Sequence, residues 1–283
     1  MVVTTRFAPS PTGLLHLGHA YSAALGHDRA RRSGGRFQLR IEDLDPSRSR
    51  QEHVAGIVDD LGWLGLTVDD EPLVQSRRLP IYAEALERLR AEGLVYPCFC
   101  TRADIVASLN APHGDAGARY PGTCRGHLED PERRASTPHS WRLDSAAALE
   151  RAGLPSWREE DGAVFHANLQ DLGDAILARK DAPASYHLAC IIDDAASGVT
   201  LVVRGDDLRA STPVQRLLQM LLNLPEPTYL HHSLVSKADG RRLAKRDQAP
   251  TLAAMRAAGV NGEALRGDLL AGRLPLGFAF PTA

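Results

Sequence analysis

The segment at residues 9–19, PSPTGLLHLGH, constrains the fold more than any other part of this 283-residue chain. It follows a short apolar segment at residues 6–9, which predicts a strand, and leads into residues 17–32, whose Ala- and Leu-rich faces predict a helix. A helix that starts directly after a strand presents unpaired backbone N–H groups, which bind phosphate. His16 and His19 lie three residues apart and share one face of the first helical turn. The sequence therefore predicts a nucleotide site, with His16 and His19 as phosphate donors and Gly18 leaving room for a base.

The rest of the chain alternates short apolar segments with helical ones. This order predicts a Rossmann-like parallel sheet covered by helices, which is an α/β fold. Residues 97–160 are rich in Pro, Gly and Arg and interrupt the order, so we interpret them as an insertion. We expect further helices at residues 51–63, 79–92 and 212–222, and further strands at residues 37–41, 186–192 and 198–204.

The first motif resembles the opening of the class I aminoacyl-tRNA synthetases, and specifically that of their glutamyl branch. Residues 6–13, RFAPSPTG, followed by HLGH at residues 16–19, look like this family's opening and its "HIGH" signature. Residues 40–45, RIEDLD, match its second strand. A bare pair of histidines is a common match, but a long run of unusual residues in register is specific. The resemblance implies a class I catalytic domain whose ATP lies at the 16–19 turn.

The family's second signature, a mobile lysine loop written "KMSKS", has its counterpart at residues 242–246, RLAKR. Lys245 keeps the second lysine of the signature, while the first lysine and the serine are replaced. The chain contains only three lysines and uses arginine elsewhere. A compact ammonium group follows a moving phosphate better than a planar guanidinium does. The resemblance implies that Lys245 joins His16 and His19 in catalysis and ATP binding, with Mg²⁺ accompanying ATP; a solvated basic loop is the alternative.

Free glutamate has two carboxylates and one ammonium group, so a selective pocket needs fixed cations and at least one anion. Arg6 can hold a carboxylate with two parallel hydrogen bonds, and Arg204 ends the strand expected at residues 198–204. Glu42 follows the second strand and can accept from an ammonium group. Two arginines favour glutamate over glutamine, because an amide would leave one cation poorly paired. Each residue alone also fits a surface or core role. By resemblance, the glutamate-binding positions are Arg6, Phe7, Ala8, Pro9, Ser10, Glu42, Tyr186 and Arg204.

Three cysteines, Cys98, Cys100 and Cys124, open the expected insertion. Three thiolates plus one oxygen or nitrogen donor complete a tetrahedral zinc site. C-x-C is a less typical spacing than C-x-x-C, and reduced cytosolic thiols are the alternative. A structural zinc ion would hold together a loop-rich segment with little core of its own. The candidates for the fourth ligand are Tyr120, which the resemblance implies, and the more conventional His113 and His127.

The expected domain organisation follows from these assignments. Only residues 246–283, 38 in number, follow Lys245, whereas full glutamyl-tRNA synthetases continue with a large anticodon-binding body. We therefore expect an isolated catalytic half without an anticodon-binding domain. The parts are a Rossmann-type domain at residues 1–96 and 161–235, a zinc-binding insertion at residues 97–160, and the lysine loop with a short helical tail at residues 236–283.

Short relatives of this kind attach glutamate to the queuosine base of tRNA(Asp). The resemblance implies a ligase that makes glutamyl-adenylate from ATP and L-glutamate and passes the glutamyl group to that base in the anticodon. Three other functions remain open. They are a short synthetase that charges a tRNA 3′ end, a nucleotidyltransferase acting on a small molecule, and an inactive RNA-binding paralogue. The paired arginines and the insertion argue against the second, and only the altered lysine loop supports the third.

The formal net charge of −2 excludes a generally basic coat, so RNA must bind a local positive patch. No apolar run approaches the roughly 20 residues needed to cross a bilayer, and the first residues lack the apolar stretch of a signal peptide. We expect a cytoplasmic monomer that does not contact membranes. Candidate RNA contacts are Arg29, Arg31, Arg32, Arg241, Arg242 and Arg246.

Overall fold

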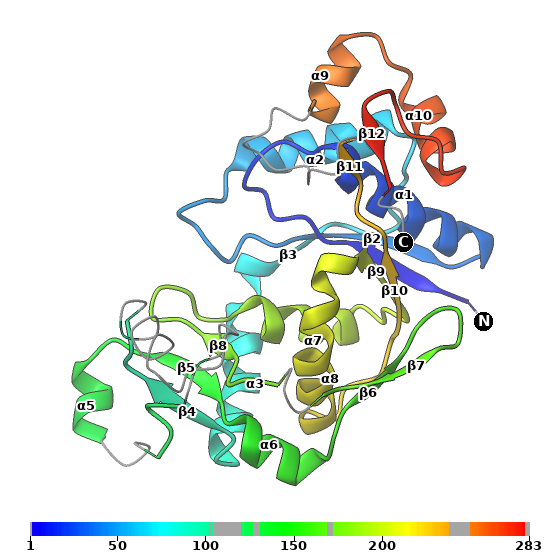
Figure 1. The fold of residues 1–283 in the computed structure, drawn as a ribbon. Helices are drawn as coiled ribbons and strands as arrows, with labels where there is room; N and C mark the ends of the chain where they lie inside the picture. The colour runs from blue at the N-terminus through cyan, green and yellow to red at the C-terminus, as the bar shows by residue number, and fades with distance from the viewer. Residues whose placement is uncertain are drawn as a thin grey trace.

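Two parallel sheets lie side by side at the centre of the molecule (Figure 1). The computed structural model describes residues 2–101, 104, 120, 122–126, 131–168, 172–237 and 250–280. One sheet has the order β1 (Thr4–Phe7), β2 (Arg36–Ile41), β3 (Leu73–Val74), and the other pairs β9 (Leu201–Gly205) with β10 (Thr228–His232). The Thr200 N–H donates to the Thr4 carbonyl at 2.9 Å, so β9 runs beside β1. The predicted α/β fold with a parallel sheet is confirmed.

The helices that flank the sheets begin and end close to the predicted residues. α1 (Leu17–Arg32) and α2 (Gln51–Trp63) have the expected bounds, and α3 (Leu79–Ala91) and α8 (Thr212–Leu221) each end one residue earlier. α1 ends because Gly34 adopts a φ of 69°, which reverses the chain and lets the Gly35 N–H donate to the Ala30 carbonyl at 2.8 Å.

The strand expected at residues 186–192 is wrong, because this segment is the start of helix α7 (Tyr186–Ala196). Its five consecutive residues from Leu188 to Ile192 are all buried. A run that is apolar on every side shows neither the two-residue alternation of a half-exposed strand nor the one-sided stripe of a surface helix. Burial on all sides therefore removed the signal that distinguishes the two.

An antiparallel sheet lies beside the parallel ones, in the order β4 (Val95–Cys98), β5 (Ser140–Leu143), β8 (Ile176–Ala178). It begins before residue 97 and ends after residue 160, so it extends past both limits of the expected insertion. Helices α5 (Pro131–Ser136) and α6 (Ser145–Ala152) and the hairpin of β6 (Ser156–Arg158) and β7 (Val164–His166) belong to the same stretch. The hairpin reaches back to the parallel body through a bridge between Glu159 and Tyr229.

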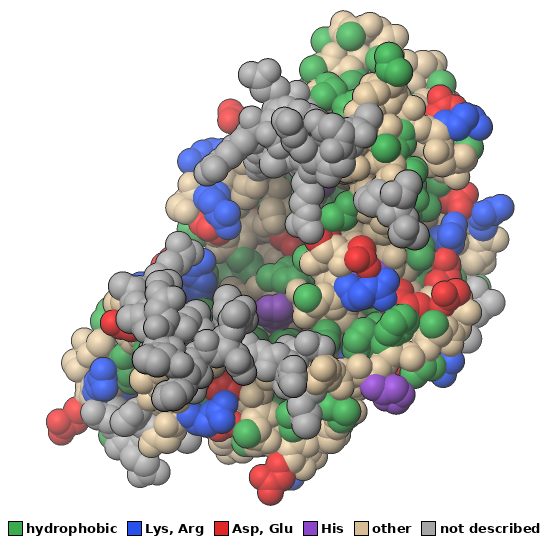
Figure 2. Space-filling view, in the orientation of Figure 1, with side chains coloured by type: hydrophobic (Ala, Val, Ile, Leu, Met, Phe, Trp, Pro, Cys, Tyr) green, Lys and Arg blue, Asp and Glu red, His purple; other side chains and the backbone are tan. Residues whose placement is uncertain are grey.

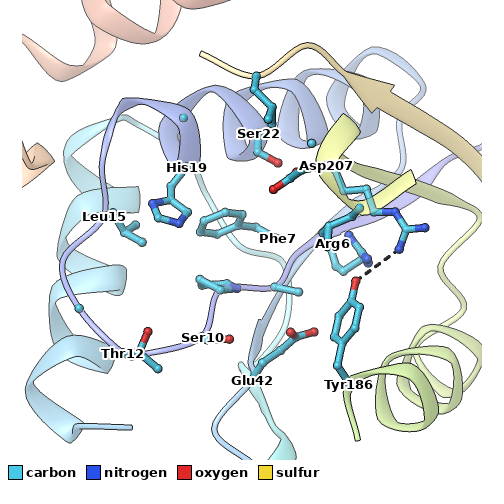
Figure 3. Close-up of a pocket in the computed structure, with 18 of the residues that line it drawn as sticks. Arg6, Phe7, Ser10, Thr12, Leu15, His19, Ser22, Glu42, Tyr186 and Asp207 are labelled. Atoms are coloured by element: carbon cyan, nitrogen blue, oxygen red, sulfur yellow. Dashed lines mark hydrogen bonds between the residues drawn. The ribbon is translucent and has the colours of Figure 1, made fainter. Parts of the chain in front are cut away.

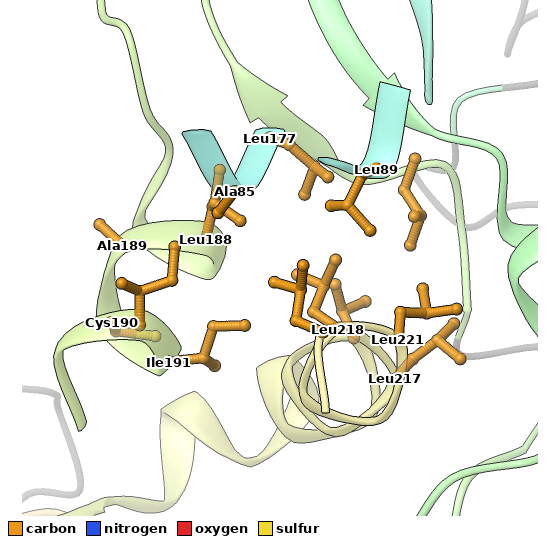
Figure 4. Packing of buried hydrophobic residues seen from close by; sticks show 14 of the residues in the cluster. Ala85, Leu89, Leu177, Leu188, Ala189, Cys190, Ile191, Leu217, Leu218 and Leu221 are labelled. Atoms are coloured by element: carbon orange, nitrogen blue, oxygen red, sulfur yellow. The ribbon is translucent and has the colours of Figure 1, made fainter. Parts of the chain in front are cut away.

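The two largest hydrophobic cores within the described residues hold these layers. The larger joins α3, α7 and α8 to β4, β5 and β8, with Leu177, Leu188 and Leu217 fully buried at their contact (Figure 4). The smaller packs α1 and α2 against β1 and β2 and includes Leu252 and Leu269 from the C-terminal helices. The boundary between the cores coincides with the parallel sheets, which places their strand ends at a junction where a cleft can form.

The C-terminal segment packs on the α1 side of the molecule (Figure 1). It contains α9 (Leu252–Ala257), α10 (Gly262–Leu270) and the antiparallel pair β11 (Ser236–Lys237) with β12 (Phe278–Ala279). Gly262 approaches α2 so closely that a Cβ atom there would lie 2.1 Å from the Trp63 carbonyl oxygen. Within the described ranges, no helix combines the length and the apolar character that crossing a membrane requires.

Asp60 joins α2 to α9 and makes the stability of this contact depend on pH. Its side chain is 2 % exposed, and Arg256 Nη1 lies 3.4 Å from Oδ1, an oxygen that has no hydrogen bond within the described part of the chain. Burial raises the pKa of Asp60 to about 6, although Arg256 opposes the shift. The folded chain therefore holds this proton more tightly than the unfolded chain does. The stability that protonated Asp60 contributes is full below about pH 4 and is lost as the pH rises through about 6.

We expect the variant Asp60→Asn, which cannot ionise, to escape this loss. The difference in free energy of unfolding between Asp60→Asn and the native chain should shift in favour of the variant by about 2 kcal/mol as the pH rises from 4 to 7.5. Urea unfolding at both pH values measures the change. A difference between the two proteins that stays constant over this range would contradict the prediction.

Candidate active site

A cleft of ≈ 1240 Å³ opens at the carboxyl-terminal ends of β1, β2, β9 and β10. Figure 2 shows this face hollowed near its centre. Lys245 lies outside the described residues. The cleft is lined by every other residue predicted to bind glutamate or ATP, namely Arg6, Phe7, Ala8, Pro9, Ser10, His16, Gly18, His19, Glu42, Tyr186 and Arg204.

The tip of α1 carries two imidazoles in a defined arrangement. The His16 backbone N–H donates to His19 Nδ1 at 3.2 Å, and the Gly18 N–H donates to His16 Nδ1 at 3.2 Å. A neutral imidazole whose Nδ1 accepts a hydrogen bond carries its proton on Nε2. Both side chains therefore cap the helix through Nδ1 and keep an N–H donor on Nε2 at the positive end of the helix dipole. The His19 ring faces the cleft (Figure 3).

Close packing fixes the position of this tip. A Cβ atom at Gly18 would lie 3.2 Å from His16 Cε1, so the glycine lets the His16 ring fold back over the first turn. The Leu252 N–H donates to the Leu15 carbonyl at 2.9 Å, and Thr251 forms a bridge with His16. The C-terminal helices therefore hold the imidazoles in place.

Arg204, at the end of β9, is a buried cation surrounded by neutral groups. It is 4 % exposed. Its Nε donates to His231 Nε2 at 3.1 Å, and its Nη1 donates to Gln215 Oε1 at 2.7 Å and to the Tyr186 hydroxyl at 3.3 Å. Its Nη2 donates to Thr212 Oγ1 at 2.7 Å. None of these four partners is a carboxylate, and a buried cation without a counter-charge is costly. The site therefore favours an anionic ligand.

Arg6 has a different environment, because its charge already has a partner inside the protein. Its Nε donates to Asp194 Oδ1 at 3.0 Å, and Arg40 donates to the same oxygen. Burial alone would raise the pKa of Asp194, but the adjacent Arg40 and Arg6 guanidinium groups hold it below its ordinary value. With Glu42, these residues form a buried cluster of two arginines and two acidic residues on the cleft floor. The role of Arg6 in holding a ligand stays a prediction.

Glu42 and Tyr186 point into the same part of the cleft (Figure 3). Burial raises the pKa of Glu42, although Arg40 lies 3.3 Å away and opposes the shift. An ammonium group bound here would favour the ionised carboxylate. Burial also raises the pKa of Tyr186 to about 12, so its hydroxyl stays protonated. This hydroxyl accepts from Arg204 and keeps its own proton to donate.

Two residues of the buried cluster were not predicted from the sequence. Arg40 lies in β2 and is 2 % exposed, and Asp194 lies in α7 and is 5 % exposed. The sequence did contain a signal for both residues. Charged residues are rarely buried, and here one lies within a buried strand and an acid pair at 193–194 lies within an apolar run. Their pairing across 154 residues could not be read from the sequence.

Three cysteines come together outside the cleft, one at the end of β4, one just after it and one in the turn at residues 123–126. The Sγ atoms of Cys98, Cys100 and Cys124 lie within 4.8 Å of one another, and those of Cys100 and Cys124 are 3.5 Å apart. The Tyr120 hydroxyl lies 3.4 Å from Cys100 Sγ. Zinc–sulfur bonds of about 2.3 Å place the sulfurs of a tetrahedral site about 3.8 Å apart, which fits this set. His113 and His127, the alternative ligands, lie outside the described residues.

The three described candidates for RNA contact are all ion-paired. Arg29 pairs with Glu160 at 2.7 Å, Arg31 with Asp69 at 2.7 Å, and Arg32 with Asp28 at 3.5 Å. Arginines that already hold surface carboxylates make a weak phosphate-binding patch. The other candidates, Arg241, Arg242 and Arg246, lie outside the described residues.

Comparison with known proteins decides the family. The family "tRNA synthetases class I (E and Q), catalytic domain" matches residues 2–271. This chain belongs to that family. The class I synthetase resemblance and the ligase class that it implied are thereby confirmed. Two relatives, both named glutamyl-Q tRNA(Asp) synthetase, come from Rhodobacter capsulatus and Symbiobacterium thermophilum. They are 47% and 45% identical to this chain over 93% of its length, which corresponds to 98% and 84% of their own lengths.

Solved structures of the family have the same fold. A glutamate tRNA ligase from Elizabethkingia meningosepticum, crystallised in complex with its amino acid, superposes with a TM-score of 0.80 at 28% identity. The match covers 95% of this chain, and the chain spans 60% of the length of that ligase.

Proposed function

We propose that this chain makes glutamyl-adenylate from ATP and L-glutamate and transfers the glutamyl group to the queuosine base in the anticodon of tRNA(Asp). One observation carries the first half: Arg204 is a buried cation whose hydrogen-bond partners among the described residues are all neutral, and it lies in the same cleft as Glu42 and the tip of α1. The names of the relatives from Rhodobacter capsulatus and Symbiobacterium thermophilum support the second half. Their similarity extends over 93% of this chain.

In this proposal, the charges of the cleft orient glutamate. The side-chain carboxylate binds Arg204 and the Tyr186 hydroxyl, and the ammonium group binds Glu42. The α-carboxylate is then left to face the α1 tip. Holding the two reactants in this order supplies much of the rate, because it replaces a bimolecular encounter by a fixed geometry.

The chemistry then needs no covalent nucleophile from the protein. An α-carboxylate oxygen attacks the α-phosphorus of ATP, the bond to the leaving phosphate breaks, and pyrophosphate departs. The Nε2–H groups of His16 and His19 donate to the phosphate oxygens as charge develops on them. Mg²⁺ enters with ATP as part of that substrate, and Lys245 would add a positive charge, as the family resemblance implies. A queuosine hydroxyl next attacks the glutamyl carbonyl carbon, and AMP leaves.

Transfer of labelled glutamate to purified tRNA(Asp) with and without queuosine tests this proposal. We expect acceptance only by the queuosine-containing tRNA, and we expect it to survive removal of the 3′-terminal adenosine, which takes away the diol that 3′ charging would use. Acceptance by unmodified tRNA(Glu) or tRNA(Gln) that periodate abolishes would show instead that the chain charges a tRNA 3′ end.

We also propose that Cys98, Cys100, Cys124 and Tyr120 hold a structural zinc ion. The mutual distances of the sulfurs support this set, and Arg125, next to Cys124, anchors the loop by donating to Asp174 at 2.6 Å. The ion would tie this loop to β4. We expect the native chain to bind about one zinc ion per chain, and we expect Cys124→Ser to lose most of this zinc and to have a lower melting temperature. Cys190 is a buried cysteine outside the cluster, so Cys190→Ser should keep the metal. Equal zinc content in the native chain and Cys124→Ser would contradict the assignment.

A further inference from the structure

Arg204 is linked through His231, which lines the cleft, to Glu159, which is not among the residues that line it. The Arg204 Nε donates to His231 Nε2 at 3.1 Å. Because a guanidinium Nε always donates, His231 Nε2 must accept, and the imidazole proton must lie on Nδ1. That Nδ1 lies 2.7 Å from Glu159 Oε1, to which it donates. An imidazole thus stands between Arg204 and the carboxylate of Glu159.

The His231 imidazole that links Arg204 to Glu159 is neutral. Its side chain is fully buried, and burial together with the positive charge of Arg204 lowers its pKa to about 4. At neutral pH the imidazole therefore carries one proton. With Nδ1–H directed at Glu159, it offers a lone pair to Arg204.

Glu159 is held firmly in its place. It follows β6, it is 7 % exposed, and its backbone forms a bridge with Tyr229 of β10. Its Oε1 also accepts from Trp157 Nε1 at 3.2 Å and from Arg209 Nη1 at 3.1 Å, and its Oε2 accepts from the His231 backbone N–H at 3.2 Å. The β6–β7 hairpin therefore brings a fixed negative charge behind the cleft wall.

We propose that Glu159, acting through His231, is a positioning residue that aims Arg204 and gives the cleft its preference for a carboxylate over an amide. This inference rests on the proposed binding of glutamate at Arg204. A carboxylate in direct contact with Arg204 would occupy the guanidinium edge that a ligand needs. The imidazole fixes the Nε side and keeps the charge of Glu159 one ring away, so that Arg204 remains cationic toward the cleft.

The hydrogen bonds of Arg204 fix the orientation of its guanidinium group. A guanidinium has five N–H donors, and Arg204 uses four of them on His231, Gln215, Tyr186 and Thr212. If the charge of Glu159 is removed, the Nδ1–H form of His231 loses part of its stabilisation, because a neutral amide oxygen accepts a hydrogen bond more weakly than a carboxylate does. The alternative Nε2–H form would point a donor at the Nε–H of Arg204, and the two donors would repel each other. Arg204 would then leave the orientation that a ligand carboxylate requires.

The variant Glu159→Gln tests the inference, because it removes the charge and keeps the shape. Its matched control is Glu160→Gln, the same change at the next residue, where an exposed carboxylate pairs only with Arg29 at 2.7 Å among the described residues. In glutamate-dependent pyrophosphate exchange, we expect Glu159→Gln to raise KM for glutamate about tenfold and to leave kcat within about threefold. The preference for glutamate over glutamine should fall by a similar factor, with KM for ATP unchanged. A purely structural loss would lower kcat and both affinities together.

The tautomer of His231 gives a readout that does not depend on activity. Imidazole nitrogen shifts in a ¹⁵N-labelled native chain should show neutral Nδ1–H at pH 7, and this signature should change in Glu159→Gln but not in Glu160→Gln. An Nε2–H form or an imidazolium in the native chain would overturn the inference, as would equal KM values in the two variants of an active enzyme. If the native chain shows no glutamate-dependent exchange, the proposed function fails, and the tautomer still decides the role of Glu159.

Discussion

Replacing Arg204 by glutamine should reduce kcat/KM for glutamate by about 10²- to 10³-fold, because removing one member of a buried charge pair costs about 2–5 kcal/mol. The substitution removes a cation whose described partners are neutral, and it leaves the bound carboxylate facing those neutral groups. The effect should appear as a higher KM for glutamate, with KM for ATP nearly unchanged. Steady-state pyrophosphate exchange at varied glutamate measures it.

Two further variants separate charge from geometry and from general damage. Arg204→Lys keeps the charge but not the planar fork, so it should recover only part of the lost affinity. Arg216→Gln makes the same change at a buried arginine outside the cleft, where Arg216 pairs with Glu226 at 2.6 Å. It should lower the melting temperature and leave KM for glutamate near the native value. If Arg216→Gln raises KM as much as Arg204→Gln does, Arg204 does not bind the substrate directly.

Replacing His19 by asparagine should lower kcat for exchange by about 10²-fold and leave KM for glutamate within about threefold, which is the signature of a donor acting in the transition state. The asparagine amide can take the place of Nδ1 and accept from the His16 N–H, so the helix keeps its cap. What is lost is the donor on Nε2. An unchanged melting temperature shows that the cap survives.

His19→Gln is the matched control, because its longer side chain places an amide N–H near the position of Nε2. It should retain more activity than His19→Asn, even though it fits the cap less well. Equal activity in the two variants, or a loss that follows the melting temperature, would mean that His19 serves only to start α1.

Local sequence patterns correctly predicted the site residues that are positioned by the start of a helix or the end of a strand. The turn at residues 9–19 determines where α1 begins, and the glycines at residues 34 and 35 end it, so α1 and its paired imidazoles lie where they were expected. Glu42 and Arg204 follow or end strands, and the carboxyl ends of parallel strands meet at one edge of a sheet. That rule brought both residues into one cleft.

Contacts between distant segments could not be predicted in this way. Tyr186 reaches the cleft from the first turn of a helix and not from a strand, because the apolar run after it is buried on every side. The different surroundings of Arg6 and Arg204 were likewise beyond the local pattern. Asp194 comes from a segment 188 residues away and compensates Arg6, while the partners of Arg204 within the described part of the chain are neutral. The charge of a buried group depends on such neighbours, which the local sequence does not show.

The central claim is that the cleft holds glutamate beside ATP. Arg204 binds the side-chain carboxylate of glutamate, Glu42 binds its ammonium group, and the α1 tip faces the phosphates. Exchange of labelled pyrophosphate into ATP by the pure, zinc-loaded chain tests this most directly. The account predicts exchange that requires L-glutamate and that L-glutamine does not support. Exchange that is absent with glutamate, or equally fast with glutamine, would contradict it.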